Sequence, residues 1–201
     1  MIASDKLEYV GARLSILLSD GVDGYQPIIY SETDVIFDKD IKPFLIEAST
    51  SSKCSAQIEL FDKFKTGSHV WGGLYKEDPF EISDVHGFNA GIFMVPNTAL
   101  HSKYIRAAYK SLKKYTENFG RNSLSFYDQA ALNYVLYKLN DFDGDLVSKF
   151  TRIGGTGNPT IHQNYGPDLN SPAGFVHFWN CSEKHKEMSD YLDDMKKRSE
   201  F

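Results

Sequence analysis

The stretch Ile28-Ile29-Tyr30-Ser31-Glu32-Thr33-Asp34-Val35-Ile36-Phe37 places two acidic residues, one position apart, between two apolar runs. The β-branched and aromatic residues before Glu32 are typical of a strand buried on both faces, inside a parallel or mixed sheet. Ligands in open α/β sheets bind beyond the carboxyl ends of strands, which is where Glu32 and Asp34 emerge. Two carboxylates there suit a divalent cation, and a divalent cation suits a diphosphate. An acidic turn without a ligand is the alternative, and the triplet alone does not decide between the two.

The bulk composition bounds the class of protein. The 201 residues fit one domain, and 41% hydrophobic with 24% charged residues is ordinary for a globular chain. The formal net charge of -5 argues against a nucleic-acid partner, because phosphate contacts need clustered Lys and Arg. Two cysteines, Cys54 and Cys181, are too few for a disulfide framework, so we expect reduced thiols and a cytoplasmic location. We expect no membrane span and no secretion signal.

Apolar spacing, caps and turn residues predict an alternation of helices and strands. The expected helices cover about residues 4–20, 99–119, 127–139 and 182–201. The expected strands are 28–32, 69–75, 88–95, 150–153 and 173–180. A short helix or turn is expected at 38–45, and loops at 49–55 and 154–159. The glycine-rich loop at 154–159 lacks the lysine of a phosphate-binding loop, which indicates a plain connecting loop.

Two further motifs carry polar side chains at the ends of expected elements. Gly91 in the sequence 88–93 lets a ligand approach the backbone, and Asn89 offers both a donor and an acceptor to sugar hydroxyls. A simple turn at the start of a strand is the alternative.

Asp128 and Gln129 begin the helix at 127–139, where their side chains can point out of the core. An N-terminal helix charge beside a neutral helix former explains that pair equally.

A late histidine, His177, follows apolar residues in the strand expected at 173–180. An imidazole there is either a metal ligand or a hydrogen-bonded core residue.

Taken in order, these motifs resemble those of glycosyltransferases of the GT-A fold, most closely the glycogenin-like, nucleotide-sugar-dependent group. Members typically show Asp-x-Asp after a buried strand, then a Phe-Asn-(Ser/Ala)-Gly strand, an Asp-Gln helix and a late His-Phe. All four occur here in that order, and Lys6-Leu7 matches a Lys-Leu pair that precedes the acidic strand. The resemblance covers residues 4–185.

This resemblance implies an α/β fold, a GT-A-type, Rossmann-like mixed β-sheet flanked by helices in a single domain. The domain is expected over residues 1–185, with a charged helix or linker at 186–201. The implied reaction is metal-dependent transfer of a hexosyl or deoxyhexosyl group from a nucleotide-diphosphate sugar, UDP-linked, to a hydroxyl of a glycan or glycoprotein acceptor, with retention. The alternatives are a nucleotide-sugar hydrolase, a domain whose donor half lies elsewhere, a non-catalytic nucleotide-sugar or carbohydrate-binding module of the same fold, and a structural α/β domain of a larger assembly.

The family also implies roles for single residues. Mn²⁺, or Mg²⁺, is expected on Glu32, Asp34 and His177, because mixed carboxylate and imidazole ligation suits Mn²⁺. Asp128 and Gln129 are the expected catalytic residues. The expected donor-binding residues are Lys6, Glu32, Thr33, Asp34, Asn89, Ala90, Gly91 and Lys184.

The chain departs from the family pattern at three places. Glu32 replaces the first Asp, and Asn180 stands where the family has a glycine after the histidine. Lys184 comes one position late for the family's phosphate-binding lysine and lacks the Pro-Trp that follows it. Almost nothing precedes Ser4, where the family has strands that bind the nucleotide. We therefore expect those strands to be missing or atypical, and the chain to be part of a longer multidomain protein.

Overall fold

The computed structural model describes residues 11–22, 24–65, 74–120, 127–154, 174–179 and 181–199. Its helices are α2 (Ala12–Leu17), a 3₁₀ turn (Asp20–Val22), α3 (Lys42–Thr50), α4 (Leu74–Glu77), α5 (Thr98–Phe119), α6 (Tyr127–Lys138), α7 (Asp145–Phe150) and α9 (Lys184–Ser199). Its strands are β1 (Ile28–Ser31), β2 (Val35–Phe37), β3 (Cys54–Lys63), β4 (His86–Val95), β5 (Phe142–Asp143), β6 (Thr151–Ile153) and β7 (Phe175–His177).

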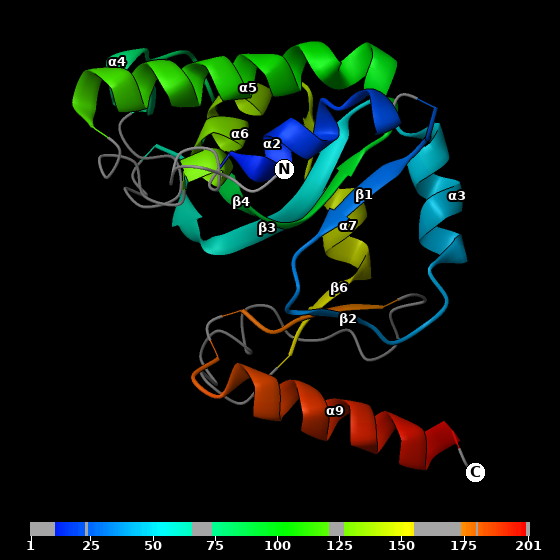
Figure 1. The fold of residues 1–201 in the computed structure, drawn as a ribbon. Coiled ribbons are helices and arrows are strands. Elements are labelled where there is room, and N and C mark those ends of the chain that lie inside the picture. Colours follow the sequence, from blue (N-terminus) through cyan, green and yellow to red (C-terminus); the bar gives the residue numbers. More distant parts are fainter. Residues whose placement is uncertain are drawn as a thin grey trace.

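The larger sheet has the strand order β1-β4-β3-β5. Strand β4 is antiparallel to both β1 and β3, whereas β5 runs parallel to β3, so the sheet is mixed. Helices α2, α5 and α6 lie together on one side of this sheet in Figure 1. Their apolar side chains form the main core with Phe88, Ala90, Phe93 and Val95 of β4. Helices α3 and α7 pack against Ile92 and Met94 on the other face.

Strand β4 changes phase in its middle. Phe93 and Val95 share a face with Phe88 and Ala90, although strict alternation would put them on opposite faces. The pairing with β3 shows the cause. Ala56 of β3 pairs with Phe93 of β4, but the next residue of β3, Gln57, pairs with Asn89, so the register skips residues 90–92 of β4. Such a bulge re-aims side chains and is common beside functional sites. Here it surrounds Gly91.

The smaller sheet, in the order β2-β7-β6, lies at the lower end of the molecule in Figure 1, beside α9. Met188, Tyr191 and Met195 of α9 pack against Val176 and Phe178. The Tyr191 hydroxyl also donates to Asp38 at 2.5 Å, and Arg152 forms an ion pair with the same carboxylate. The terminal helix is thus attached to the small sheet by both apolar and charged contacts.

The mixed α/β fold with flanking helices is confirmed, and so are the long helices at 99–119 and 127–139 to within one residue at each end. Gly120 ends α5 with φ +88°, a conformation that favours glycine. No helix in the described part of the chain has the length and apolar character needed to cross a bilayer.

Four expectations about secondary structure were wrong. Strand β1 is half-buried rather than buried on both faces, because it is the edge strand among the described strands of its sheet. The loop expected at 49–55 is confined to residues 51–53, because α3 ends at Thr50 and β3 begins at Cys54. Within the strand expected at 69–75, residues 74 and 75 are helical, and 69–73 lie outside the described residues. The strand expected at 173–180 is shorter, spanning Phe175–His177.

Candidate functional site

The two acidic residues of the opening motif meet His177 where β1 gives way to β2. Val35 pairs with His177 across β2 and β7, so Asp34 stands directly beside the imidazole. The Phe178 backbone N–H donates to the Asp34 carbonyl at 2.8 Å, which fixes that approach. One ligand atom from each of Glu32, Asp34 and His177 lies within 4.8 Å of the others. We call these three residues the carboxylate–histidine group.

The facing atoms of this group fit a cation. His177 Nε2 and Asp34 Oδ1 lie 3.5 Å apart, and both are buried without a hydrogen-bond partner. Buried polar atoms are normally paired, so two orphaned ligand atoms that face each other need an explanation. A divalent ion between them, also reached by the Glu32 carboxylate, would satisfy both. The oxygen and nitrogen donors match the preference of Mn²⁺.

Lys184, the first residue of α9, holds the other oxygen of Asp34. Its Nζ lies 2.6 Å from Asp34 Oδ2, and its side chain is 38% exposed. Burial acts to raise the pKa of Asp34, but the nearby His177 imidazole and Lys184 ammonium outweigh it and lower the pKa well below its usual range. Asp34 is therefore an anion at neutral pH, as a metal ligand must be.

Gly91 makes room for His177. A Cβ placed on Gly91 would lie 2.7 Å from His177 Nε2 and closer still to Cε1, so close that the imidazole would have to shift. Asn89 is held in the same bulge, since its Oδ1 accepts from the Gly91 N–H at 2.7 Å and its Nδ2 donates to Glu59 at 3.2 Å. The Asn89 amide thus shapes the loop of backbone beside the imidazole.

Arg13 of α2 joins the acidic motif to helix α6. Its guanidinium donates to Glu32 Oε1 at 2.6 Å and to the Ala90 carbonyl at 2.7 Å, and its Nε lies 3.4 Å from Asp128 Oδ2. The Arg13 side chain is only 8% exposed, and its Cζ lies 4.6 Å from the centre of the Tyr30 ring. The buried Arg13 guanidinium therefore contacts two carboxylates and one backbone carbonyl.

The side chains of α6 complete the open edge of β4. Gln129 accepts the Ala90 N–H at 2.9 Å, and Asn133 bonds both the N–H and the carbonyl of Phe88 at 2.8 Å. These amides take the place of a neighbouring strand, because β1 pairs with β4 only from Ile92 onward. Asp128 and Gln129 are both buried, so the expectation that they point out of the core was wrong. Their side chains face β4 and Arg13 instead.

Burial dominates the electrostatics of Asp128. It raises the pKa of this carboxyl to about 6, with the Glu32 charge acting in the same direction and Arg13 opposing it. A carboxyl group that titrates near neutrality, beside a buried guanidinium, is typical of functional sites.

The structure brings most of the expected site residues into one region. Asn89, Ala90 and Gly91 form the bulge beside His177, and Gln129 contacts that bulge directly. Thr33 is exposed at the surface of the turn, and Lys6 lies outside the described residues.

Sequence reasoning missed three residues that organise this region: Arg13, Gln57 and Glu59. Arg13 had a readable signal, since position 13 falls on the same helical stripe as Val10, Leu14 and Leu17. A charged residue on an apolar stripe indicates a buried ion pair. Gln57 belongs to β3, whose first residues were predicted to be a loop. Its Oε1 lies 3.5 Å from His177 Nδ1.

No family model matches the chain, and no curated protein matches its sequence. Solved structures do match. The bifunctional glycosyltransferase WbbM, in its apo form, aligns with 85% of this chain at a TM-score of 0.58 and 15% identity. An active-site mutant of LgtC aligns with 89% at 0.55 and 14% identity, and mouse xyloside xylosyltransferase 1 with 86% at 0.52 and 14% identity.

The chain is shorter than each of these proteins. It covers 31% of the WbbM chain, 64% of the LgtC chain and 63% of the xylosyltransferase chain. The structural likeness extends over most of the present chain and joins it to three glycosyltransferases. The chain has the GT-A glycosyltransferase fold.

Proposed function

We propose that this chain is the catalytic region of a metal-dependent glycosyltransferase. It would transfer a sugar from a nucleotide-diphosphate donor, UDP-linked, to an acceptor hydroxyl with retention of the anomeric configuration. The observation that carries this proposal is the pair of orphaned atoms, Asp34 Oδ1 and His177 Nε2, which face each other beside Glu32 in a GT-A fold. A cation between these atoms would account for their geometry and would neutralise charge on a diphosphate leaving group.

Glu32, Asp34 and His177 would hold the ion, with Mn²⁺ favoured. When bound, the ion supplies Lewis-acid neutralisation of the charge that develops on the departing diphosphate. Lys184 would support the same task, because its ammonium already lies at the edge of the group and is partly exposed. A lysine that releases Asp34 to the metal can contact a phosphate oxygen instead.

The remaining residues would position the donor. The bulge formed by Asn89, Ala90 and Gly91 presents backbone and an amide next to His177, where a sugar attached to the diphosphate would lie. Asp128 would act on this bulge indirectly, through its ion pair with Arg13, and Gln129 through the hydrogen bond that it accepts from the Ala90 N–H. Catalysis by positioning and charge stabilisation fits this arrangement, in which both side chains are held in place by their partners.

Nucleotide binding is the first experiment. The melting temperature should be measured with UDP, GDP and CMP, each with and without Mn²⁺, and UDP with Mn²⁺ is expected to give the largest rise. The protein should then be incubated with UDP-sugars and a panel of glycan acceptors, with NMR of the product anomer to test retention.

The outcomes separate the alternatives. A Mn²⁺-dependent shift with UDP release only in the presence of an acceptor supports the transferase. Release without an acceptor indicates a hydrolase, and a shift without turnover of any UDP-sugar indicates a binding module. No shift with any nucleotide and metal contradicts the proposed function.

A further inference from the structure

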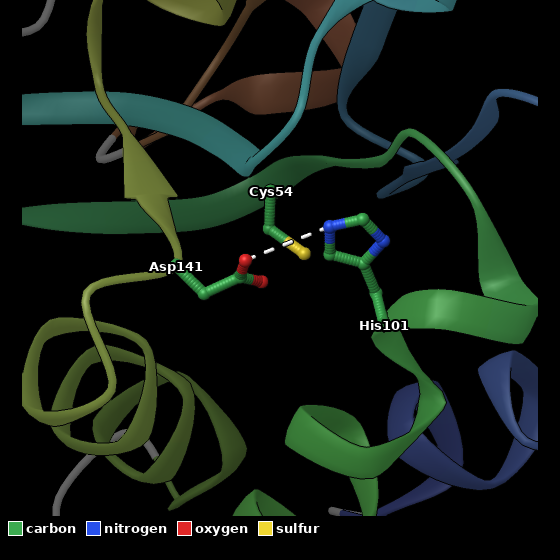
Figure 2. Close-up of side chains that lie close together, drawn as sticks. All are labelled: Cys54, His101 and Asp141. Carbon is green, nitrogen blue, oxygen red and sulfur yellow. Dashed lines mark ion pairs between the residues drawn. The ribbon is translucent and has the colours of Figure 1, made fainter.

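A second group of potential metal ligands lies where the start of β3 meets α5 and β5. Cys54 begins β3, His101 lies in the first turn of α5 and Asp141 directly precedes β5 (Figure 2). All three are buried, and their ligand atoms lie within 4.8 Å of one another. Figure 2 shows the thiol pointing into the space between the imidazole and the carboxylate. We call these residues the cysteine–histidine group.

Backbone contacts hold this group in place. The Cys54 N–H donates to the Asp141 carbonyl at 3.1 Å, and Cys54 is the pairing partner of Phe142 where β3 and β5 meet. The His101 N–H donates to the Asn97 carbonyl at 3.0 Å in the first turn of α5. The three ligands therefore stand on ordered backbone from three separate elements.

The imidazole of His101 has acceptors on both sides. Its Nδ1 lies 2.8 Å from the Asn97 carbonyl oxygen, so Nδ1 carries a proton and donates it there. Its Nε2 then faces the Ser52 carbonyl at 3.1 Å and Asp141 Oδ1 at 3.5 Å. Asp141 Oδ2 is buried without a hydrogen-bond partner. Lone pairs of Nε2 and of the two oxygens that face it converge on one point, and either a second proton on His101 or a metal ion placed there makes the arrangement favourable.

We propose that Cys54, His101 and Asp141 bind a Zn²⁺ ion that has a structural role, separate from the carboxylate–histidine group. A thiolate, a neutral imidazole and a carboxylate are all zinc ligands, and the Ser52 carbonyl lies close enough to serve as a fourth. The Nδ1–H bond to a backbone carbonyl is the outer contact that typically orients a metal-binding histidine.

Charge balance suits this ion as well as a second proton on His101, and the thiol beside the imidazole favours the ion, because a thiolate is a zinc ligand. Two anionic ligands and one divalent cation sum to zero, which suits a fully buried site. Without metal the thiol is protonated, because burial and the neighbouring Asp141 carboxylate raise the pKa of Cys54. Binding therefore forms a zinc–sulfur bond and releases the thiol proton to solvent, with no change in oxidation state.

The consequence is a clamp between α5, β3 and β5. Because the ligands come from three elements, the bound ion would oppose their separation during unfolding. Strand β3 continues from Cys54 to Gln57 beside His177, so the clamp also fixes the start of the strand that supports the candidate site.

Metal content and cobalt spectroscopy test the proposal. The full chain, reduced and metal-free, should be titrated with Zn²⁺ or Co²⁺ alone. We expect at least one tightly bound Zn²⁺ per chain, release of a proton, a rise of several degrees in melting temperature, and a thiolate-to-cobalt charge-transfer band with Co²⁺. Cys54→Ser should lose the band and the melting shift.

Matched variants assign the site. Cys181→Ser removes the other cysteine, and Asp34→Asn disables the carboxylate–histidine group; both should keep the cobalt band. A wild-type protein that binds Co²⁺ without a charge-transfer band, or that binds no metal and instead shows a doubly protonated His101 by NMR, overturns the proposal. The cobalt spectrum of the wild-type chain decides this even if Cys54→Ser does not fold.

Discussion

The two groups of potential metal ligands differ in their access to solvent. In the carboxylate–histidine group, Asp34 and His177 are buried, but Glu32 and the neighbouring Lys184 are 39% and 38% exposed. In the cysteine–histidine group every ligand is enclosed. A site that exchanges substrate needs exposed, mobile partners, whereas a structural site does best without them. Similar ligand chemistry can therefore serve turnover beside Gln57 of β3 and stability at Cys54, where the same strand begins.

Among changes at the carboxylate–histidine group, Asp34→Asn is expected to have the largest effect on activity. The isosteric amide keeps the volume but removes the anion, so transfer of sugar from a UDP-sugar should fall by about 100-fold to 1000-fold. Initial rates at saturating Mn²⁺ measure it. Asp84→Asn, which removes an exposed carboxylate, is the control and should retain full activity. Equal rates for the two variants would show that Asp34 is not a ligand in catalysis.

Arg13→Met tests the buried ion pairs that support the carboxylate–histidine group. Removing the guanidinium leaves the buried Asp128 without its cation, so the free energy of unfolding should fall by about 3–5 kcal/mol. Urea denaturation at pH 7 measures the change. Arg106→Met removes an exposed arginine of α5 and should change stability by less than about 0.5 kcal/mol. A similar small change for Arg13→Met would mean that its ion pairs contribute little.

Gly91→Ala tests the close approach of β4 and His177. The added methyl would overlap the imidazole, and such overpacking costs about 1–3 kcal/mol of stability. Mn²⁺ affinity should fall with it, because His177 must move. Gly24→Ala, where a Cβ meets nothing within 4 Å, is the matched control. Unchanged metal affinity in Gly91→Ala would separate His177 from the metal site.

Asp128 gives a smaller, pH-dependent effect. Its pKa in the folded protein is about 6, above the ordinary value of 3.8, so folding disfavours its charged form. The stability of the wild type relative to Asp128→Asn should be highest below pH 4 and should decline as the pH rises to about 6. Urea midpoints of both proteins from pH 4 to 8 measure this. A difference that increases with pH would contradict the assigned direction.

Several elements could be read from the sequence because their signals are local. Helix α5 has its cap at Asn97 and its stop at Gly120, and β4 ends in a continuous apolar run from Ile92 to Val95. The association of Asp34 with His177 came from the family resemblance and from the order of motifs. Their spatial contact depends on the pairing of β2 with β7, which no local signal specifies.

Strand β3 was missed because one of its two buried faces carries polar side chains. Ser55, Gln57 and Glu59 are all buried, and a serine-rich start was taken for a loop. The alternation of polar and apolar residues over 54–59 was the available signal, since period two is typical of a strand. The cysteine–histidine group could not be predicted, because its ligands are 47 and 40 residues apart in sequence and only the sheet and α5 bring them together.

We propose that the carboxylate–histidine group holds a divalent ion that binds a diphosphate. Pulsed electron paramagnetic resonance of Mn²⁺ bound to the protein with UDP tests it most directly, because hyperfine couplings identify the atoms bonded to the metal. We predict a nitrogen coupling that disappears in His177→Gln, together with phosphorus couplings from the diphosphate. Phosphorus couplings without any nitrogen coupling in the wild type would show that Mn²⁺ is carried by the nucleotide alone and would contradict the claim.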